Sequence, residues 1–415
     1  MHSKSSDAVA SIGIALLCLA YVVITLLITP APAHESPAVR PASSGSLDDD
    51  WVELFNGRDF TGWTTTSGGE IHWAIRNGEM YPLPEAGGSW LRTEKMYRDF
   101  ELELEFFLVE GGNSGVGLRC SHAGDPAFTG MELQIYDTWG QDIHPGCAGA
   151  VYNAITPRSM ALNQPPSWNA YRIRLIGDTL DVWLNGVPIH EAEKLDERGY
   201  FRQPEDKRPL RDRLPTGYIA LQEHGAPIRF RNIRLRDLSP DPDPGGYEFL
   251  FNHRDLDGWE VTGAAAWTVE GGTLVGRDGP GHLFTTAEFD DFELRAFVRV
   301  NERGNGGIYC RARPNPDDAD SWPVGYEAQV DQHDPRNFTG SIYDRAWASA
   351  HPGTRDGAWF DYRIRAEGGH LQTWINGRPQ VDAQLDAFGS GRIALQSHHP
   401  GNAIEFRDLR IRRLP

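Results

Sequence analysis

An internal repeat constrains the fold of this chain more than any other feature. A series of short blocks recurs, in the same order, in two successive parts of the chain. The block WVELFNGRDFTGW at Trp51–Trp63 returns as YEFLFNHRDLDGW at Tyr247–Trp259, and GYIALQEH at Gly217–His224 returns as GRIALQSH at Gly391–His398. Many blocks in one order predict two homologous domains, because a single motif can recur by chance but an ordered series cannot.

The repeat also sets the domain limits. We place the first domain at residues 51–238, a linker at 239–247 and the second domain at 248–415. The first copy carries a charged insertion, Glu193–Pro215, that the second copy lacks. Such a long connection forms either the border of an active site or a solvated surface excursion.

The pattern inside each copy predicts an all-β fold. Short alternating segments are separated by turn residues, in a chain with 45 Gly and 28 Pro. The Asn-Gly pairs within Leu184–Gly186 and Ile375–Gly377 are typical of tight hairpins, since both residues accept a positive φ. Copies of this size and pattern fit a two-sheet jelly-roll sandwich.

The charge balance narrows the choice of partners. The net charge is −18, which argues against a nucleic-acid partner because such proteins usually carry a basic patch. It is compatible with a protein that acts on neutral molecules. The 13 Trp also suit sugar binding, although most are expected in the core.

The N-terminal region predicts an extracytoplasmic protein, whether periplasmic, secreted or membrane-anchored. Ala8–Ile28 is almost unbroken apolar sequence and precedes an A-x-A-like site at Ala31–Ala33. Residues 1–33 are therefore either a cleaved signal peptide or a single-span membrane anchor, and residues 34–50 are a disordered tether. In an exported chain, Cys120 and Cys147 could form a disulfide.

One stretch stands out as a candidate site, GMELQIYD at Gly130–Asp137, with its echo GYEAQVDQ at Gly325–Gln332. In a strand, Met131, Leu133 and Ile135 face one side and Glu132, Gln134 and Tyr136 face the other. A solvated sheet face explains one copy of such a pattern. Its recurrence favours a functional face.

The same alternation predicts further residues on that face. Along Gly217–His224, burial of Ile219 and Leu221 leaves Gln222 and His224 on the opposite side. In NSGVGLR, Gly117 and Arg119 are expected to face outward, with Gly117 leaving room for a ligand.

Taken together, LFNGRDFTGW, NSGVGLR, GMELQIYD, AGAVY, LNG and GYIALQEHGAPIRFRNIRL resemble the 3-keto-disaccharide hydrolase family, also described as 3-keto-glucoside 1,2-lyase and 3-keto-2-hydroxyglucal hydratase. The resemblance covers residues 51–238 closely and 248–415 more loosely. It implies a concanavalin A-like or laminin-G-like sandwich and an exported enzyme acting on glycosides oxidised at C3.

The implied chemistry is elimination. A C3 ketone acidifies the C2 proton, a base removes it, and the enolate expels the group on C1; water then adds to the product. Such a site needs a base near C2, a donor or a metal ion for the enolate oxygen, and an acid for the leaving oxygen.

We assign candidate roles within this scheme. The catalytic candidates are Glu132, His224 and Arg119, and the substrate-binding candidates are Gln134, Asp137, Tyr152 and Gln222. Arg119 could instead, or in addition, form a structural ion pair with Glu132 across the sheet, and His224 could be a strand-end histidine bonded to a turn. Asp137 and His224 could also ligate a divalent metal ion, since carboxylates and imidazoles do so together.

The second copy retains part of this set and departs from it in places. The retained positions are Arg311, Glu327, Gln329, Tyr343, Gln396 and His398. Asp331 lies one position earlier than Asp137 and is expected to face the other way. These departures leave two readings of the second copy, a binding module or a degenerate copy kept for packing. For the whole chain, the alternative to an enzyme is a non-catalytic carbohydrate-binding or adhesion protein.

Overall fold

The computed structural model describes residues 50–84, 90–198, 209–318 and 321–415. Residues 1–33 and most of the tether predicted at 34–50 lie outside this range. Within it, no helix is both long and apolar enough to cross a membrane.

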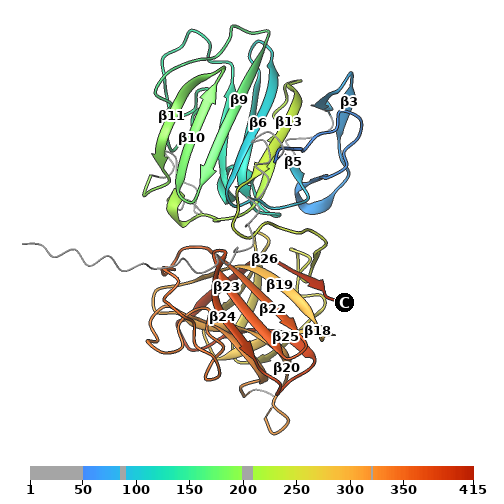
Figure 1. Cartoon of the computed structure of the whole chain (residues 1–415), viewed down its shortest axis with the longest axis vertical. Coiled ribbons are helices and arrows are strands. Elements are labelled where there is room, and N and C mark those ends of the chain that lie inside the picture. The colour runs from blue at the N-terminus through green and yellow to red at the C-terminus, as the bar shows by residue number, and fades with distance from the viewer. Residues whose placement is uncertain (1–49, 85–89, 199–208, 319–320) are drawn as a thin grey trace, which may run out of the picture. The chain divides into compact units, whose positions relative to one another are not determined.

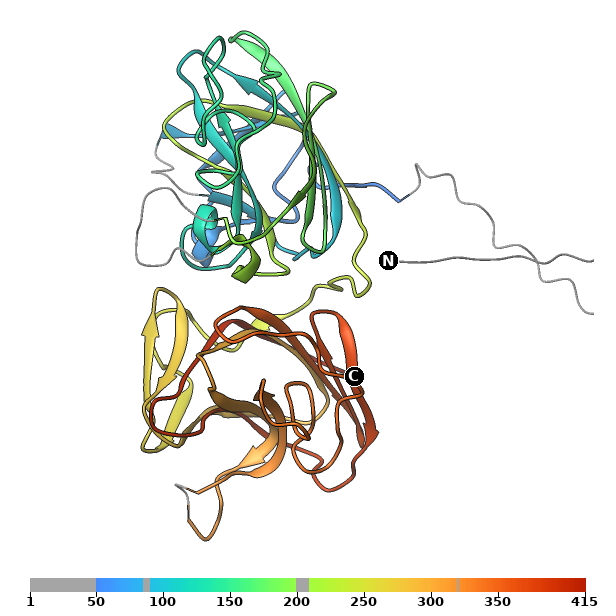
Figure 2. The same ribbon diagram turned by 90° about the vertical axis from the view of Figure 1, so that its left-hand side faces the viewer.

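The described chain is almost entirely β-structure, and its strands form two bodies that each contain an eight-stranded and a five-stranded sheet (Figures 1 and 2). Helical segments in this range are short, namely α1 (Pro126–Thr129) and the 3-10 turns η1 (Thr66–Gly68) and η3 (Leu210–Asp212). The all-β class with two tandem sandwiches is confirmed.

The first sandwich is built as follows. Its larger sheet contains β1 (Val52–Glu53), β3 (Trp73–Arg76), β4 (Glu79–Pro82), β6 (Phe100–Leu108), β9 (Ser167–Ile176), β10 (Thr179–Leu184), β11 (Val187–Lys194) and β13 (Arg229–Asp237). Its smaller sheet contains β2 (Trp63–Thr65), β5 (Trp90–Thr93), β7 (Asn113–Cys120), β8 (Met131–Tyr136) and β12 (Tyr218–Gln222).

The second sandwich repeats this arrangement. Its larger sheet contains β14 (Glu248–Phe249), β16 (Ala266–Glu270), β17 (Thr273–Arg277), β19 (Phe292–Val300), β22 (Phe360–Glu367), β23 (His370–Ile375), β24 (Arg378–Gln384) and β26 (Ala403–Arg413). Its smaller sheet contains β15 (Trp259–Gly263), β18 (Gly281–Phe289), β20 (Asn305–Arg313), β21 (Val324–Asp331) and β25 (Gly391–Ser397).

The strand orders of the two bodies correspond strand for strand. The smaller sheets run β2-β5-β12-β7-β8 and β15-β18-β25-β20-β21, and the larger sheets run β11-β10-β9-β6-β13-β4-β3 and β24-β23-β22-β19-β26-β17-β16. Each body also has its own apolar core. The repeat seen in the sequence is thus a repeat of the whole fold.

The Asn-Gly hairpins form where the sequence predicts them. Asn185 and Gly186 have φ of 51° and 79°, and Asn376 and Gly377 have φ of 50° and 72°. Positive φ at both central residues defines the turn whose twist matches the flanking strands.

The disulfide that an exported chain could form between Cys120 and Cys147 is not present in this structure. Cys120 and Cys147 are both buried free thiols, and Cys310 is a third. Burial raises the pKa of the Cys120 thiol well above its usual range, so this side chain behaves as a small apolar group.

Candidate functional site

In the first sandwich, β8 alternates as the sequence predicts. Leu133 and Ile135 are fully buried in the core. Glu132 and Gln134 point the opposite way, to the outer face of the five-stranded sheet. By register, Glu132 lies opposite Gly117 and Gln134 opposite Gly115 on the neighbouring strand β7. This outer face is the candidate site of the first copy.

Glu132 is a buried carboxyl group, and one of its oxygens lacks a partner among the described residues. Its side chain is 3% exposed, and its Oε1 accepts no hydrogen bond within the described part of the chain. It fits there because Gly115 has no side chain: a Cβ at Gly115 would lie 1.9 Å from Oε1. Burial, and secondarily the charge of Asp125, raises the pKa of Glu132 to about 8. The carboxyl is therefore largely protonated at neutral pH.

Two further buried oxygens on this face also lack donors. They are Gln134 Oε1 and Asn113 Oδ1, neither of which has a partner among the described residues. Asn113 lies opposite Tyr136 on β8, so it shares the face of Glu132. Buried acceptors normally find donors. Three such oxygens on one face are suited to a ligand that carries several hydroxyl groups.

The remaining predicted residues lie around this face at different depths. The imidazole Nδ1 of His224 is 3.2 Å from Asn113 Nδ2, which brings His224 to the same side. Gln222 ends β12 and lies opposite Trp90. The Tyr152 backbone N–H donates to the Glu132 carbonyl oxygen at 2.9 Å, so Tyr152 borders β8.

The proposed metal ligands do not form a metal site. Asp137 Oδ2 accepts the backbone N–H of Gly111 at 2.8 Å, and His224 is engaged with Asn113. Across the described ranges, no group of three or more His, Cys, Asp or Glu side chains is arranged to hold a metal ion. These residues do not fit a divalent cation, and no step below is assigned to one.

Arg119 lies elsewhere, which corrects the prediction that it faces the site. Its φ is 52°, and the pairing of β7 with β12 skips a residue between Cys120 and Gly117, so the strand bulges at this point. The bulge turns the guanidinium toward the carbonyls of Arg98 and Gly177, each at 2.7 Å, and toward Asp99. Arg119 is therefore a structural residue.

The same bulge changes the environment of Gly117. The Cys120 thiol takes the place on the outer face that strict alternation would give to Arg119. A Cβ at Gly117 would lie 2.6 Å from Cys120 Sγ and 3.3 Å from the Trp90 ring. The space above Gly117 is thus filled by protein, and the prediction that it receives a ligand is wrong.

The described end of the insertion is packed against the first sandwich. Residues 199–208 lie outside the described range. Leu210, Arg213 and Leu214 are buried. Arg213 Nη1 donates to the Gly130 carbonyl just before β8, at 2.5 Å. For residues 209–215, the interpretation as a solvated excursion does not hold.

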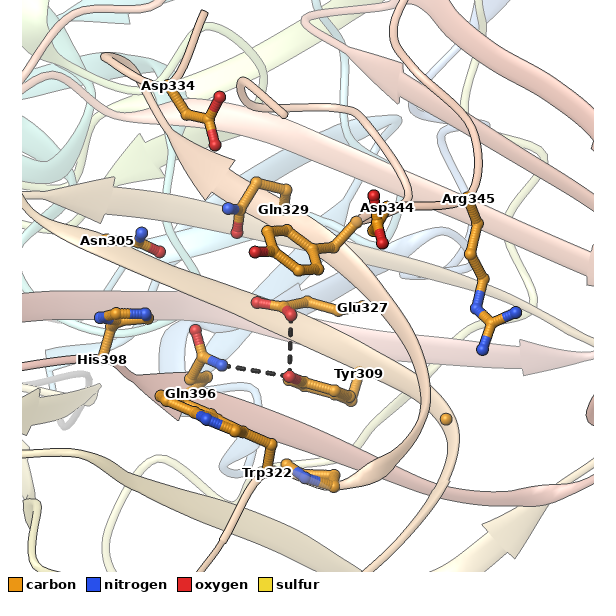
Figure 3. Close-up of a pocket in the computed structure, with 13 residues that line it drawn as sticks. Asn305, Tyr309, Trp322, Glu327, Gln329, Asp334, Asp344, Arg345, Gln396 and His398 are labelled. Carbon is orange, nitrogen blue, oxygen red and sulfur yellow. Dashed lines mark hydrogen bonds between the residues drawn. The ribbon is translucent and has the colours of Figure 1, made fainter. Parts of the chain in front are cut away.

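The second sandwich has an open pocket at the equivalent place (Figure 3). Its volume is about 580 Å³. Five of the six positions retained from the first copy line it, namely Glu327, Gln329, Tyr343, Gln396 and His398. The sixth, Arg311, repeats the bulge of Arg119 with φ of 50° and bonds the Asp290 carbonyl and Asp291, so it is also structural.

Glu327 accepts the last hydrogen bond of a short chain in this pocket. The Tyr309 hydroxyl donates to Glu327 Oε2 at 2.8 Å, and Gln396 Nε2 donates to that hydroxyl at 3.2 Å (Figure 3). Burial raises the pKa of Glu327 to about 7, and the hydrogen bonds from Tyr309 and Gln396 limit the rise. A pKa near the working pH suits a group that gains and loses a proton during a reaction.

Aromatic rings form another side of the pocket. Trp322 stacks on His398 with ring centroids 5.0 Å apart, and 44% of its surface remains exposed. Beneath it, His282 is buried, and neither ring nitrogen has a partner among the described residues. Burial, together with His398, lowers the pKa of His282 to about 4, so its ring is neutral. Burial and His399 lower the pKa of His398 as well.

Sequence reasoning missed several lining residues. Tyr309 stands at the position of Gly117 in the aligned blocks NGGIYCR and NSGVGLR, so that exchange was the available signal. Trp322 lies in a connection whose sequence matches no block of the first copy, so the sequence gave no signal for it. Asp331 accepts from Asn305 Nδ2 at 3.0 Å, which places it beside the pocket residue Asn305, unlike Asp137.

These features define a class of protein: a tandem β-sandwich with a glutamate and amide side chains on the outer face of each smaller sheet. The model of the 3-keto-alpha-glucoside-1,2-lyase-like domain matches residues 50–236 and again 246–412. The chain belongs to this family and contains two copies of its domain. Membership in the family supports a carbohydrate-active enzyme.

Similar proteins were found at low identity. A 3-keto-disaccharide hydrolase of Bacteroides thetaiotaomicron is 23% identical over 249 residues, which covers 49% of this chain and 85% of that protein. A crystal structure of a candidate glycosyl hydrolase from Parabacteroides distasonis is 23% identical, with 46% of this chain and 94% of that one covered and a TM-score of 0.40. A carbohydrate-binding module from Bacillus subtilis is 24% identical, with 37% and 93% covered and a TM-score of 0.29.

Proposed function

We propose that this chain cleaves 3-keto-glycosides by removing the C2 proton and eliminating the group on C1. The observation that carries the proposal is Glu327, a carboxylate with a pKa of about 7 in a pocket of about 580 Å³ beside amide donors. The named relative acts, by its name, on a 3-keto-disaccharide, which agrees with this choice of substrate.

Glu327 is the base in this proposal. Its carboxylate takes the C2 proton, and the C2–H electron pair forms the enolate with the C3 carbonyl. The enolate then expels the C1 oxygen substituent and leaves a C1=C2 double bond conjugated with the ketone. The amides of Gln329 and Asn305, both lining the pocket, are donors for the enolate oxygen.

The rest of the pocket serves the sugar ring and the leaving group. The neutral His398 imidazole offers an N–H to the departing oxygen. The exposed face of Trp322 is available for the C–H face of a pyranose ring. A pocket of this size is within the usual range for small ligands.

The test is release of the C1 group from a chromogenic 3-keto-glucoside by the full chain. We expect release from the keto substrate and none from the same glucoside with an intact C3 hydroxyl, because only a ketone acidifies C2. Glu327→Gln should reduce the release rate by about 10²- to 10⁴-fold, the usual contribution of a general base. Equal release from both glucosides, or full activity in Glu327→Gln, would contradict the proposal.

A non-catalytic carbohydrate-binding protein is the second candidate. The three buried acceptor oxygens on the face of Glu132 favour it, since they need only hydroxyl donors and no chemistry. If the chain binds an unoxidised glycan but releases no C1 group from any 3-keto substrate, this alternative is supported and the proposed reaction is contradicted.

We also propose that the chain is exported, on the basis of the apolar segment Ala8–Ile28. Cell fractionation with N-terminal sequencing of the mature protein would test this and would distinguish cleavage from anchorage. Recovery of the full-length chain in the cytoplasm would contradict it.

A further inference from the structure

One exchange between the two candidate sites changes the hydrogen bonding of the site glutamate. Tyr309 and Gly117 occupy the same strand position, each opposite the site glutamate of its own sandwich. Tyr309 gives Glu327 a hydrogen-bond donor at 2.8 Å. Gly117 has no side chain, and the volume beside it is taken by the Cys120 thiol and the Trp90 ring.

The exchange gives the two carboxyl groups different proton occupancy. A carboxylate that accepts a hydroxyl hydrogen bond is stabilised in its charged form, whereas a buried carboxyl without a donor favours its neutral form. Glu132 Oε1 is such a group, because it is buried and has no partner among the described residues. The raised pKa of Glu132, about 8 against about 7 for Glu327, agrees with this geometry.

We propose that the two sandwiches divide the reaction, so that the site of Glu327 eliminates the C1 group and the site of Glu132 hydrates the resulting enone. This inference rests on the proposed function and deepens it. The substrate of the first sandwich would be the conjugated glycal-type ketone that elimination produces, rather than the 3-keto-glycoside itself.

The hydration step balances with residues of the first sandwich. A water oxygen forms a bond to C1 while the C1=C2 π electrons move toward C2 and the ketone. The Glu132 carboxyl delivers its proton to C2. The imidazole of His224, which contacts Asn113 on the same face, takes a proton from the water. Transfer of that proton back to Glu132 through solvent restores both groups, so one water is consumed for each double bond.

The unpartnered oxygens of the first site fit this substrate. The enone keeps the ring hydroxyl groups of the sugar, and Gln134 Oε1 and Asn113 Oδ1 are buried acceptors that need hydroxyl donors. Their need for donors does not depend on the pKa of Glu132. It is an independent indication that a polyhydroxylated ligand belongs on this face.

The experiment follows both steps in one reaction of the full chain with a chromogenic 3-keto-glucoside. Release of the chromophore reports elimination, and the ultraviolet absorption of the conjugated ketone reports the intermediate. In Glu132→Gln we expect release within about twofold of wild type, with the intermediate accumulating and its decay slowed at least tenfold toward the uncatalysed rate. Glu327→Gln should lose release but still hydrate the intermediate, prepared with Glu132→Gln and freed of enzyme by ultrafiltration.

Controls separate this idea from the proposed function. The matched control is Glu260→Gln, which changes an exposed carboxyl group on β15. This variant should match wild type in both chromophore release and decay of the intermediate. If Glu132→Gln no longer releases the chromophore, or if the intermediate decays there at the wild-type rate, the assignment of the two steps to different sandwiches is wrong. The proposal that the chain cleaves 3-keto-glycosides would still stand. No release by wild type from any 3-keto-glycoside would instead refute the proposed function.

Discussion

The two sandwiches share a topology and a glutamate at the same strand position but give that glutamate different surroundings. Glu327 receives a hydrogen bond from Tyr309 in an open pocket, whereas Glu132 lies 3% exposed with an unpartnered oxygen. The difference in hydrogen bonding arises from one position on β7 and β20, where Gly117 in the first copy is replaced by Tyr309 in the second. It teaches that in a duplicated fold the backbone fixes where a carboxyl stands, while the cross-strand neighbour sets whether it holds a proton.

The largest expected effect concerns stability against pH. Glu132 binds its proton more tightly in the folded chain, with a pKa of about 8 against an ordinary value of 4.5. Its contribution to folding is therefore fully present below pH 4.5 and is lost as the pH rises through 8. Between pH 4 and pH 9 this amounts to on the order of 4 kcal/mol, at about 1.4 kcal/mol per pKa unit.

Urea unfolding of the full chain at several pH values measures this effect. The free energy of unfolding of wild type, relative to Glu132→Gln, should fall as the pH rises. The same comparison for Glu327→Gln should give a smaller fall, spread between about pH 4.5 and pH 7, because the pKa shift of Glu327 is smaller. If the unfolding free energy of wild type relative to each variant depends on pH in the same way, the two glutamates do not differ in proton binding.

The next effect concerns a feature that the copies share. Arg119 and Arg311 each hold a strand bulge to neighbouring loops through buried hydrogen bonds. Arg119→Ala and Arg311→Ala should each cost about 3 kcal/mol of unfolding free energy, since the freed carbonyls and carboxylate lose their donor. Under conditions in which both variants remain folded, their KM for a 3-keto-glucoside should be within about twofold of the wild-type value. A large KM increase with unchanged stability would return Arg119 to the catalytic role first expected of it.

Arg119 shows where prediction of side-chain direction from the sequence stops being accurate. Alternation placed Glu132, Gln134 and Gln222 correctly, because hydrophobic periodicity fixes the face of a half-buried strand. It failed at Arg119 because a bulge adds one residue and reverses the parity beyond it. Arg119 itself adopts φ of 52°, which nothing in its residue type announces.

Other parts of the two sites could not be predicted from the sequence, for different reasons. The repeat predicted both sandwiches, since each block occupies the same strand in both copies. The pocket of the second copy depends on Trp322, which lies in the β20–β21 connection, and the sequence of that connection does not match the β7–β8 connection of the first copy. The fate of Asp137 was likewise hidden, because its binding of the Gly111 backbone N–H depends on where two strands end.

A change at Tyr309 sharpens the comparison in a single site. Tyr309→Phe removes the donor to Glu327 while keeping the ring, so the pKa of Glu327 should rise toward that of Glu132. The acidic limb of the profile of kcat/KM against pH should move up by about one unit, giving a roughly tenfold loss near pH 6 and a smaller one above pH 8. An equal loss at every pH would mean that Tyr309 acts only in packing.

The smallest effect concerns sugar binding in the pocket. Trp322 is 44% exposed and stacks on His398, so its ring is available to the substrate in both the ground state and the transition state. Trp322→Ala should therefore raise KM by about fivefold with little change in kcat, corresponding to about 1 kcal/mol of aromatic contact. The matched control is Trp347→Ala, which removes an equally exposed ring that does not line the pocket. The same KM change in both variants would show that Trp322 is not the sugar platform. A loss of kcat confined to Trp322→Ala would show that the ring acts on Glu327 or His398 instead.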